Sequence, residues 1–128
     1  MDLEVTPATL ADGETVDLMT HDDFGRVTVT AWDHAGSLVG VAWFETTRGR
    51  RPAPASVEVT PEHRRDGLGT ALLRQLLAEA SARHVGWLTW TEPADDLAAS
   101  KLAKASDAIC ARHVDHGRAR SAILVRAA

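Results

Sequence analysis

The sequence predicts a mixed α/β fold, close to α+β, in which helices cover both faces of a mixed sheet. Three observations lead to this prediction: apolar and polar residues alternate over residues 26–45, the spacing becomes helical after Gly67, and strand-forming residues return at 85–91. The chain has 128 residues. Domains usually contain about 100–150 residues, so we expect residues 1–128 to form a single domain.

The first part of the chain begins with a weak pattern for secondary structure and continues with a clear pattern for two strands. Residues 3–6 are typical of a strand, and Thr6-Pro7 is typical of the start of a short helix, with threonine as the N-cap and proline at the first helical position. Residues 26–31 and 38–45 then predict two strands, and Asp33-His34-Ala35-Gly36 predicts the turn between them. These two strands are therefore expected to form a β-hairpin.

A strand–helix–strand unit is expected next. Residues 56–60 predict a strand ended by Pro61, which lacks the N–H donor needed for further pairing. An apolar stripe then predicts a helix of about four turns that begins near Gly67. Its members are Leu68, Leu72, Leu73, Leu76, Leu77 and Ala80. Because a helix separates them, the strands at 56–60 and 85–91 are expected to be parallel, with a right-handed crossover.

Two more elements follow the unit. A second helix, capped by Asp95 or Asp96, is expected to present Leu97, Leu102, Ala105 and Ile109 at helical spacing. Residues 119–125 predict the final strand.

Charge and cysteine content limit the function classes. The net charge is −4, so we expect neither a nucleic-acid nor an anionic membrane partner. The first 25 residues contain seven carboxylates and no lysine or arginine, which indicates either a solvated face or an acidic surface for a cationic substrate. The longest apolar run, residues 38–44, is too short to span a bilayer. One cysteine and no basic-then-apolar leader predict a cytoplasmic protein.

The segment between the strand at 56–60 and the following helix has the features of an anion site. Gly67 and Gly69 let the backbone approach a ligand closely, and the first N–H groups of the helix lie beside them. Arg64 and Arg65 precede the glycines, and a pyrophosphate fits such a combination. A P-loop lysine is missing after the last glycine, and Leu72 stands where a dinucleotide fingerprint needs its third glycine.

Arg64-x-x-Gly67-x-Gly69, after a strand that ends in Val-x-Pro, resembles the acetyl-CoA motif of the GCN5-related N-acetyltransferase (GNAT) superfamily. The resemblance extends from Val57 through the helix to the strand residues 87–91. It implies a splayed sheet in which acetyl-CoA, as co-substrate, enters between the two parallel strands, and it implies no metal. The residues that it assigns to cofactor binding are Val57, Val59, Arg64, Arg65, Asp66, Gly67, Leu68, Gly69, Thr70 and Ser100.

The resemblance also implies direct transfer to an amine, assisted by a base. Glu58 is the first candidate because it lies on the strand that would line the cofactor, and Glu45 and Glu92 are the alternatives. The sequence departs from the family in having no tyrosine; Ala103 stands where the family places one, near Ser100.

We therefore predict an N-acetyltransferase that acts on a primary amine of a small molecule, or on a protein lysine or N-terminus. A homodimer is left open. The alternative is a domain of the same fold that binds CoA or a partner and has lost catalysis. Cys110-x-x-His113-x-x-His116 has metal-like spacing but no fourth ligand, so no metal is expected.

Overall fold

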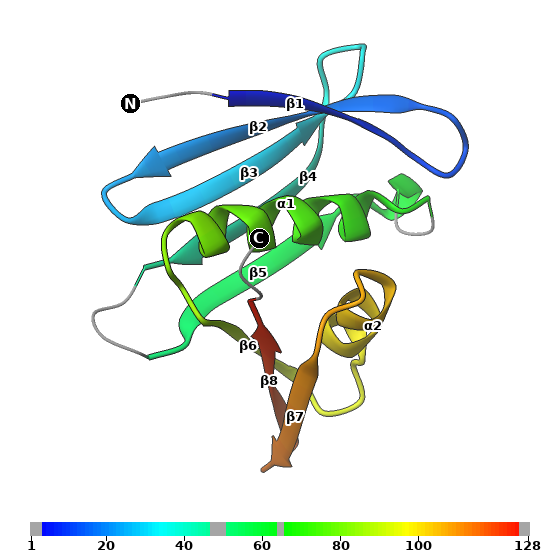
Figure 1. Cartoon of the computed structure of the whole chain (residues 1–128). Helices are drawn as coiled ribbons and strands as arrows, with labels where there is room; N and C mark the ends of the chain where they lie inside the picture. The colour runs from blue at the N-terminus through cyan, green and yellow to red at the C-terminus, as the bar shows by residue number, and fades with distance from the viewer. Residues whose placement is uncertain (1–3, 47–50, 64–65, 126–128) are drawn as a thin grey trace.

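The computed structural model describes residues 4–46, 51–63 and 66–125 (Figure 1). Within them, eight strands form one sheet in the order β1-β2-β3-β4-β5-β6-β8-β7. The strands are β1 (Glu4–Thr9), β2 (Thr15–Asp23), β3 (Arg26–Trp32), β4 (Leu38–Glu45), β5 (Ala53–Val59), β6 (Trp87–Pro93), β7 (Cys110–Asp115) and β8 (Arg118–Leu124). The helices are η1 (Pro61–His63), α1 (Leu68–Ala82) and α2 (Ala98–Ala105). Only the β5–β6 pair is parallel, so the predicted mixed α/β class is confirmed.

The N-terminal part is an antiparallel pair of strands, and the short helix expected after Thr6 is wrong. Strand β1 continues through Pro7, which pairs with Asp17 of β2. Because β1 is the edge strand of the sheet, a residue without an N–H donor is tolerated there. Strand β2 buries Val16 and Leu18 at alternate positions, a period that favours a strand.

The predicted hairpin is confirmed as β3 and β4. The turn between them is held by Asp33, whose carboxylate accepts the N–H groups of Ala35 at 3.0 Å and of Ser37 at 2.9 Å. Strand β4 continues the sheet to β5 in antiparallel register, with Gly40 opposite Val59.

Helix α1 holds the core together. It lies across the sheet (Figure 1) and fully buries Leu68, Leu72, Leu73 and Leu76. Each buried leucine side chain contributes roughly 1.5–3 kcal/mol of hydrophobic stabilisation. Gly40 of β4 permits the close approach, because a Cβ at this position would lie 2.8 Å from Cδ1 of Leu72. The glycine therefore sets the distance between α1 and the sheet.

Strands β5 and β6 separate soon after they begin. They pair only at Ala53 with Leu88 and at Pro54 with Thr89. Beyond this point β5 stays paired with β4, and β6 stays paired with β8 as far as Pro93. Residues 55–58 of β5 therefore have no strand partner on the side of β6, as the GNAT resemblance implied.

The C-terminal part differs from the sequence prediction in two ways. Helix α2 ends at Ala105, and Ile109 lies outside it. The chain turns at Asp107, where φ is +57°, and then forms β7, which was not predicted. Cys110 and His113 consequently lie on a strand, where side chains three residues apart point to opposite faces.

The two α-helices α1 and α2 cover the same face of the sheet, which corrects the expectation of helices on both faces. Leu73 of α1, Ala103 of α2 and Ile123 of β8 form one buried cluster. Ile123 is the ladder neighbour of Leu88, which packs in the larger core under α1. The N-terminal segment, in which a short helix was expected after Thr6, forms β1 and β2 instead. Among the described residues, no helix has the length and apolarity required to cross a membrane.

Candidate functional site

A cavity of about 680 Å³ lies where β5 faces the start of α1 and helix α2. Its lining residues are Val57, Glu58, Val59, Gly69, Asp96, Ala98, Lys101 and Leu102. The structure thus brings together four residues to which the sequence assigned a role in the site, and residues of α2 face them. Lys101 and Ala98 were not predicted, although residues 98, 101 and 102 recur at the i, i+3, i+4 spacing of one helix face.

The N-terminus of α1 presents backbone N–H groups beside this cavity. Gly67 has φ +90°, a left-handed conformation that glycine adopts without strain. The first four N–H groups of a helix, counted from the N-cap, have no partner within the helix. The Asp66 carboxylate accepts the N–H of Leu68 at 3.2 Å. No acceptor among the described residues is recorded for the N–H groups of Gly69 and Thr70.

Gly69 has a packing role that the sequence did not reveal. A Cβ built at this position would lie 2.9 Å from Cδ2 of Leu102 and 3.7 Å from Cγ2 of Val59. The missing side chain therefore lets α2 approach the start of α1 and gives the cavity its width. Arg64 and Arg65, the predicted phosphate ligands, lie outside the described residues.

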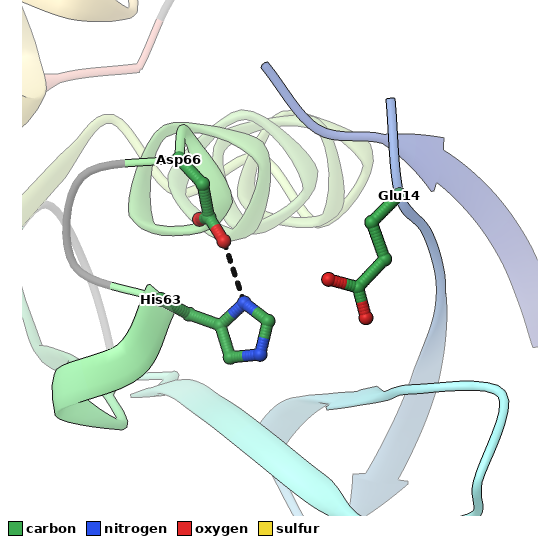
Figure 2. A group of neighbouring side chains, drawn as sticks. All are labelled: Glu14, His63 and Asp66. Carbon is green, nitrogen blue, oxygen red and sulfur yellow. Dashed lines mark hydrogen bonds and ion pairs between the residues drawn. The ribbon is translucent and has the colours of Figure 1, made fainter. Parts of the chain in front are cut away.

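Asp66 is held in a cluster with His63 and Glu14 (Figure 2). The His63 Nδ1 and the Asp66 carboxylate are 2.6 Å apart, and one polar atom of each of the three side chains lies within 4.8 Å of the others. The Asp66 carbonyl also accepts the N–H of Ala11 at 2.8 Å. These contacts fix the residue before Gly67 to the connection between β1 and β2.

The cluster predicts a pH-dependent stability. The hydrogen bond to Asp66 raises the pKa of His63 above 6.5; burial opposes this shift, and the charges of Asp66 and Glu14 add to it. A raised pKa means that the ion pair stabilises the fold fully below about pH 6.5, and that this stabilisation is lost as the pH rises through the native pKa. Urea unfolding between pH 5.5 and 8.5 should therefore show that His63→Gln costs roughly 1 kcal/mol at the acidic end and little at the basic end.

A matched control for this measurement is His34→Gln, because His34 is exposed in the turn after β3. Its free energy of unfolding should follow that of the wild type at every pH. If the difference between His63→Gln and wild type does not vary with pH, the charged pair contributes nothing to stability.

Glu58 is exposed and lies on the face of β5 that also carries Ser56. The two alternative bases have other surroundings. The Glu45 carboxylate forms an ion pair with Arg26 at 3.0 Å. Glu92 is only 7% exposed. Burial raises the pKa of Glu92, the charge of Asp96 raises it further, and a hydrogen bond from the backbone N–H of Ala99 opposes the rise. Of the three candidate bases, Glu58 is the one that lines the cavity.

Ser100 faces away from the cavity lining. Its Oγ lies 4.0 Å from Sγ of Cys110, and it is not among the residues that line the cavity. Ala103, at the expected tyrosine position, is buried in the cluster with Leu73. Lys101 is the cation that α2 supplies to the described lining.

A second cavity, of about 660 Å³, opens where β5 and β6 separate. Its described lining residues are Trp43, Arg51, Pro52, Pro54, Ala55, Ser56, Thr89, Trp90, Thr91 and Arg120. Trp43 and Arg120 alternate along their strands with residues buried in the core, so this cavity opens on the face opposite the helices. Ser56 in this cavity and Glu58 in the first lie two residues apart on one face of β5, which places both cavities along the same gap.

The sheet splits between its two parallel strands, and helix N–H groups without an acceptor among the described residues lie beside the split. This arrangement agrees with the acyltransferase class that the glycine motif indicated. Residues 4–106 match the model of the acetyltransferase (GNAT) family, and the chain belongs to this family. Over 70 residues it is 37% identical to a mycothiol acetyltransferase of Nocardia farcinica (strain IFM 10152), a match that covers 55% of this chain and 23% of that protein.

Solved structures share the fold. The GNAT domain of S. lividans PAT matches with a TM-score of 0.79 and 16% identity over 94% of this chain and 97% of that domain. A cAMP-binding acyltransferase from Mycobacterium smegmatis matches with a TM-score of 0.79 and 14% identity, over 97% of this chain and 48% of that protein.

Proposed function

We propose that the chain transfers an acetyl group from acetyl-CoA to a primary amine. The observation that carries this proposal is the gap between β5 and β6, which lies beside the open N–H groups of α1. The family supports acyl transfer, and the residues around the gap support this particular donor and an amine acceptor.

The described residues fit a thioester with a diphosphate. Residues 55–58 of β5 offer a strand edge that β6 does not cover, and an amide-bearing chain can pair with such an edge. The N–H groups of Gly69 and Thr70 suit phosphate oxygens, and Lys101 adds a positive charge. When bound, acetyl-CoA supplies an activated acyl carbon and a thiolate leaving group.

The residues of the chain would then position the amine and remove its proton. An alkylamine is mostly protonated at neutral pH, so it must lose a proton before it attacks. Glu58 accepts that proton, directly or through a water molecule. A C–N bond forms at the acyl carbon, the C–S bond breaks, and the products are an amide and the free thiol after the thiolate takes up a proton. Backbone N–H groups at the edge of β5 stabilise the oxyanion.

One observation favours the alternative, a domain that binds CoA without catalysis. Ala103 occupies the position where the family places a tyrosine, and it is buried. No hydroxyl of the described lining replaces it in the first cavity. The thiol has an ordinary pKa near 8.5, however, and can leave as the thiolate.

Thiol release and ligand binding together distinguish the two functions. We expect acetyl-CoA and CoA to raise the melting temperature, since a ligand that binds only the native state stabilises it. We also expect a panel of primary amines to produce acetyl-CoA-dependent thiol release with at least one member. Binding without release across the panel would favour the alternative, and no binding would contradict both functions.

We also propose that residues 1–128 form one domain. Strand β1 lies at one edge of the sheet and β7 at the other, so elements from both parts of the chain belong to the same sheet (Figure 1). The expected cytoplasmic location rests on the sequence and stays a prediction.

A further inference from the structure

The charges of the second cavity differ from those expected for a polyamine site. Arg51 and Arg120 lie in its wall, and the described lining contains no aspartate or glutamate. The acidic residues of the N-terminal strands are elsewhere: Asp22 pairs with Arg83 at 3.2 Å, and Glu14 lies near His63. The sequence analysis gave an acidic surface for a cationic substrate as one interpretation of these carboxylates. In the described part of the chain, they line neither cavity.

Arg120 is available to bind a ligand. It is exposed on β8, opposite Thr91 of β6, and no carboxylate of the described residues lies within ion-pair distance of it. Other arginines are occupied: Arg26 binds Glu45, and Arg112 donates to the carbonyl of Ala94 at 2.7 Å. A guanidinium favours carboxylate and phosphate oxygens, which it can bind through two parallel hydrogen bonds.

The remaining walls suit a small apolar body. Trp43 and Trp90 line the cavity together with prolines, and the guanidinium of Arg26 lies 4.2 Å from the ring centre of Trp43. Stacking by Arg26 holds this ring in place. A volume of about 660 Å³ fits a molecule of metabolite size.

We propose that the acceptor is a small amine that also carries an anionic group, with Arg120 binding the anion. The proposal rests on the proposed transferase function and names its substrate class. The apolar part of the acceptor lies against Trp43 and the prolines of the wall, and its amine points toward the gap, on the side of Ser56 and Glu58. Polyamines are poor acceptors, because the Arg120 guanidinium repels them and the described lining offers no carboxylate to bind them.

Matched acceptors test the anion requirement. L-phenylalanine and L-phenylalaninamide differ only in the carboxylate, O-phosphoethanolamine and ethanolamine differ only in the phosphate, and spermidine represents the polyamines. With saturating acetyl-CoA, we expect kcat/KM for thiol release to be at least about tenfold higher for the anionic member of one pair. The pair that shows the difference identifies the anion. Higher kcat/KM for spermidine than for both anionic amines would overturn the proposal.

Arg120→Gln tests the assigned residue. We expect it to lower kcat/KM for the preferred anionic acceptor about tenfold, mainly by raising KM. The kcat/KM for the neutral acceptor of the same pair and the Kd of acetyl-CoA should stay unchanged. Arg118→Gln is the matched control, because Arg118 lies two residues away on the same face of β8 and does not line the cavity. An equal loss for anionic and neutral acceptors, or an equal effect of Arg118→Gln, would overturn the assignment.

A binding measurement separates this inference from the proposed function. N-acetyl-L-phenylalanine and N-acetyl-O-phosphoethanolamine, the two expected products, are titrated by calorimetry into the protein saturated with CoA. Binding that Arg120→Gln abolishes supports the anion site even if no amine is acetylated, in which case only the transferase function fails. Absence of binding by the wild type would overturn the anion site.

Discussion

Gly69→Glu is expected to weaken acetyl-CoA binding at least about 100-fold, which corresponds to about 2.7 kcal/mol. Gly69 lies at the first turn of α1 and lines the first cavity, so the new carboxylate would occupy space between β5 and α2. Its negative charge would also compete with a diphosphate for the N–H groups of Gly69 and Thr70. Isothermal titration with acetyl-CoA measures the loss, and the thermal shift on ligand addition should disappear with it.

Gly69→Ala is the matched control. Both substitutions place a Cβ 2.9 Å from Cδ2 of Leu102, the end of a side chain that can move, so both impose the same steric demand there. Only the glutamate adds charge and length. We therefore expect Gly69→Ala to retain binding within a few fold. Gly67→Glu is a poorer test, because φ is +90° at Gly67 and any side chain would strain the loop itself. Normal binding by Gly69→Glu would contradict the assigned site.

Glu58→Gln is expected to lower kcat for an alkylamine about 100-fold or more, the usual loss when a general base is removed. The amide keeps the size of the side chain but cannot take up the proton of the ammonium group. Because Glu58 is exposed, the free energy of unfolding should change by less than about 0.5 kcal/mol. Thiol release measured at saturating acetyl-CoA, with unfolding followed in parallel, checks both expectations.

Acceptors that differ in protonation state show whether Glu58 acts as a base or only shapes the gap. An amine that is already neutral at the assay pH, such as a hydrazine, needs no base, so Glu58→Gln should lower its turnover far less. Glu45→Gln serves as the control, because Glu45 is half-exposed, pairs with Arg26 and lines neither cavity. Equal losses for protonated and neutral amines would remove Glu58 from proton transfer.

Much of the central fold is determined by local sequence. Helix α1 is predicted from its leucine stripe, because a single apolar face at 3.6-residue spacing has one way to be buried. The hairpin of β3 and β4 is predicted from alternation and from the turn chemistry of Asp33. The glycine motif likewise predicts the open helix terminus, because the N–H groups at that point are free in any helix.

The errors fall where local signals are weak. Thr6-Pro7 favours a helix start by itself, yet pairing with β2 places it in an edge strand. Strand β7 was not predicted, because most of its residues are exposed and its strand state depends on pairing with β8. In both cases pairing with the next strand of a hairpin determines the conformation, and the propensity of the segment itself does not contain that information.

The sequence by itself indicated the family and the class of the fold, predicted the α1 helix, and assigned a role to Val57, Glu58 and Gly69, which line one cavity. Only the tertiary structure decided that β5 and β6 separate after Pro54, that Gly69 makes room for Leu102, that Lys101 lines the same cavity, and that Arg120 faces a second cavity. The physical reason is that helix periodicity and turn chemistry act between neighbours in the chain. The separation of strands and the charge of a cavity depend on which distant side chains the packed core brings together.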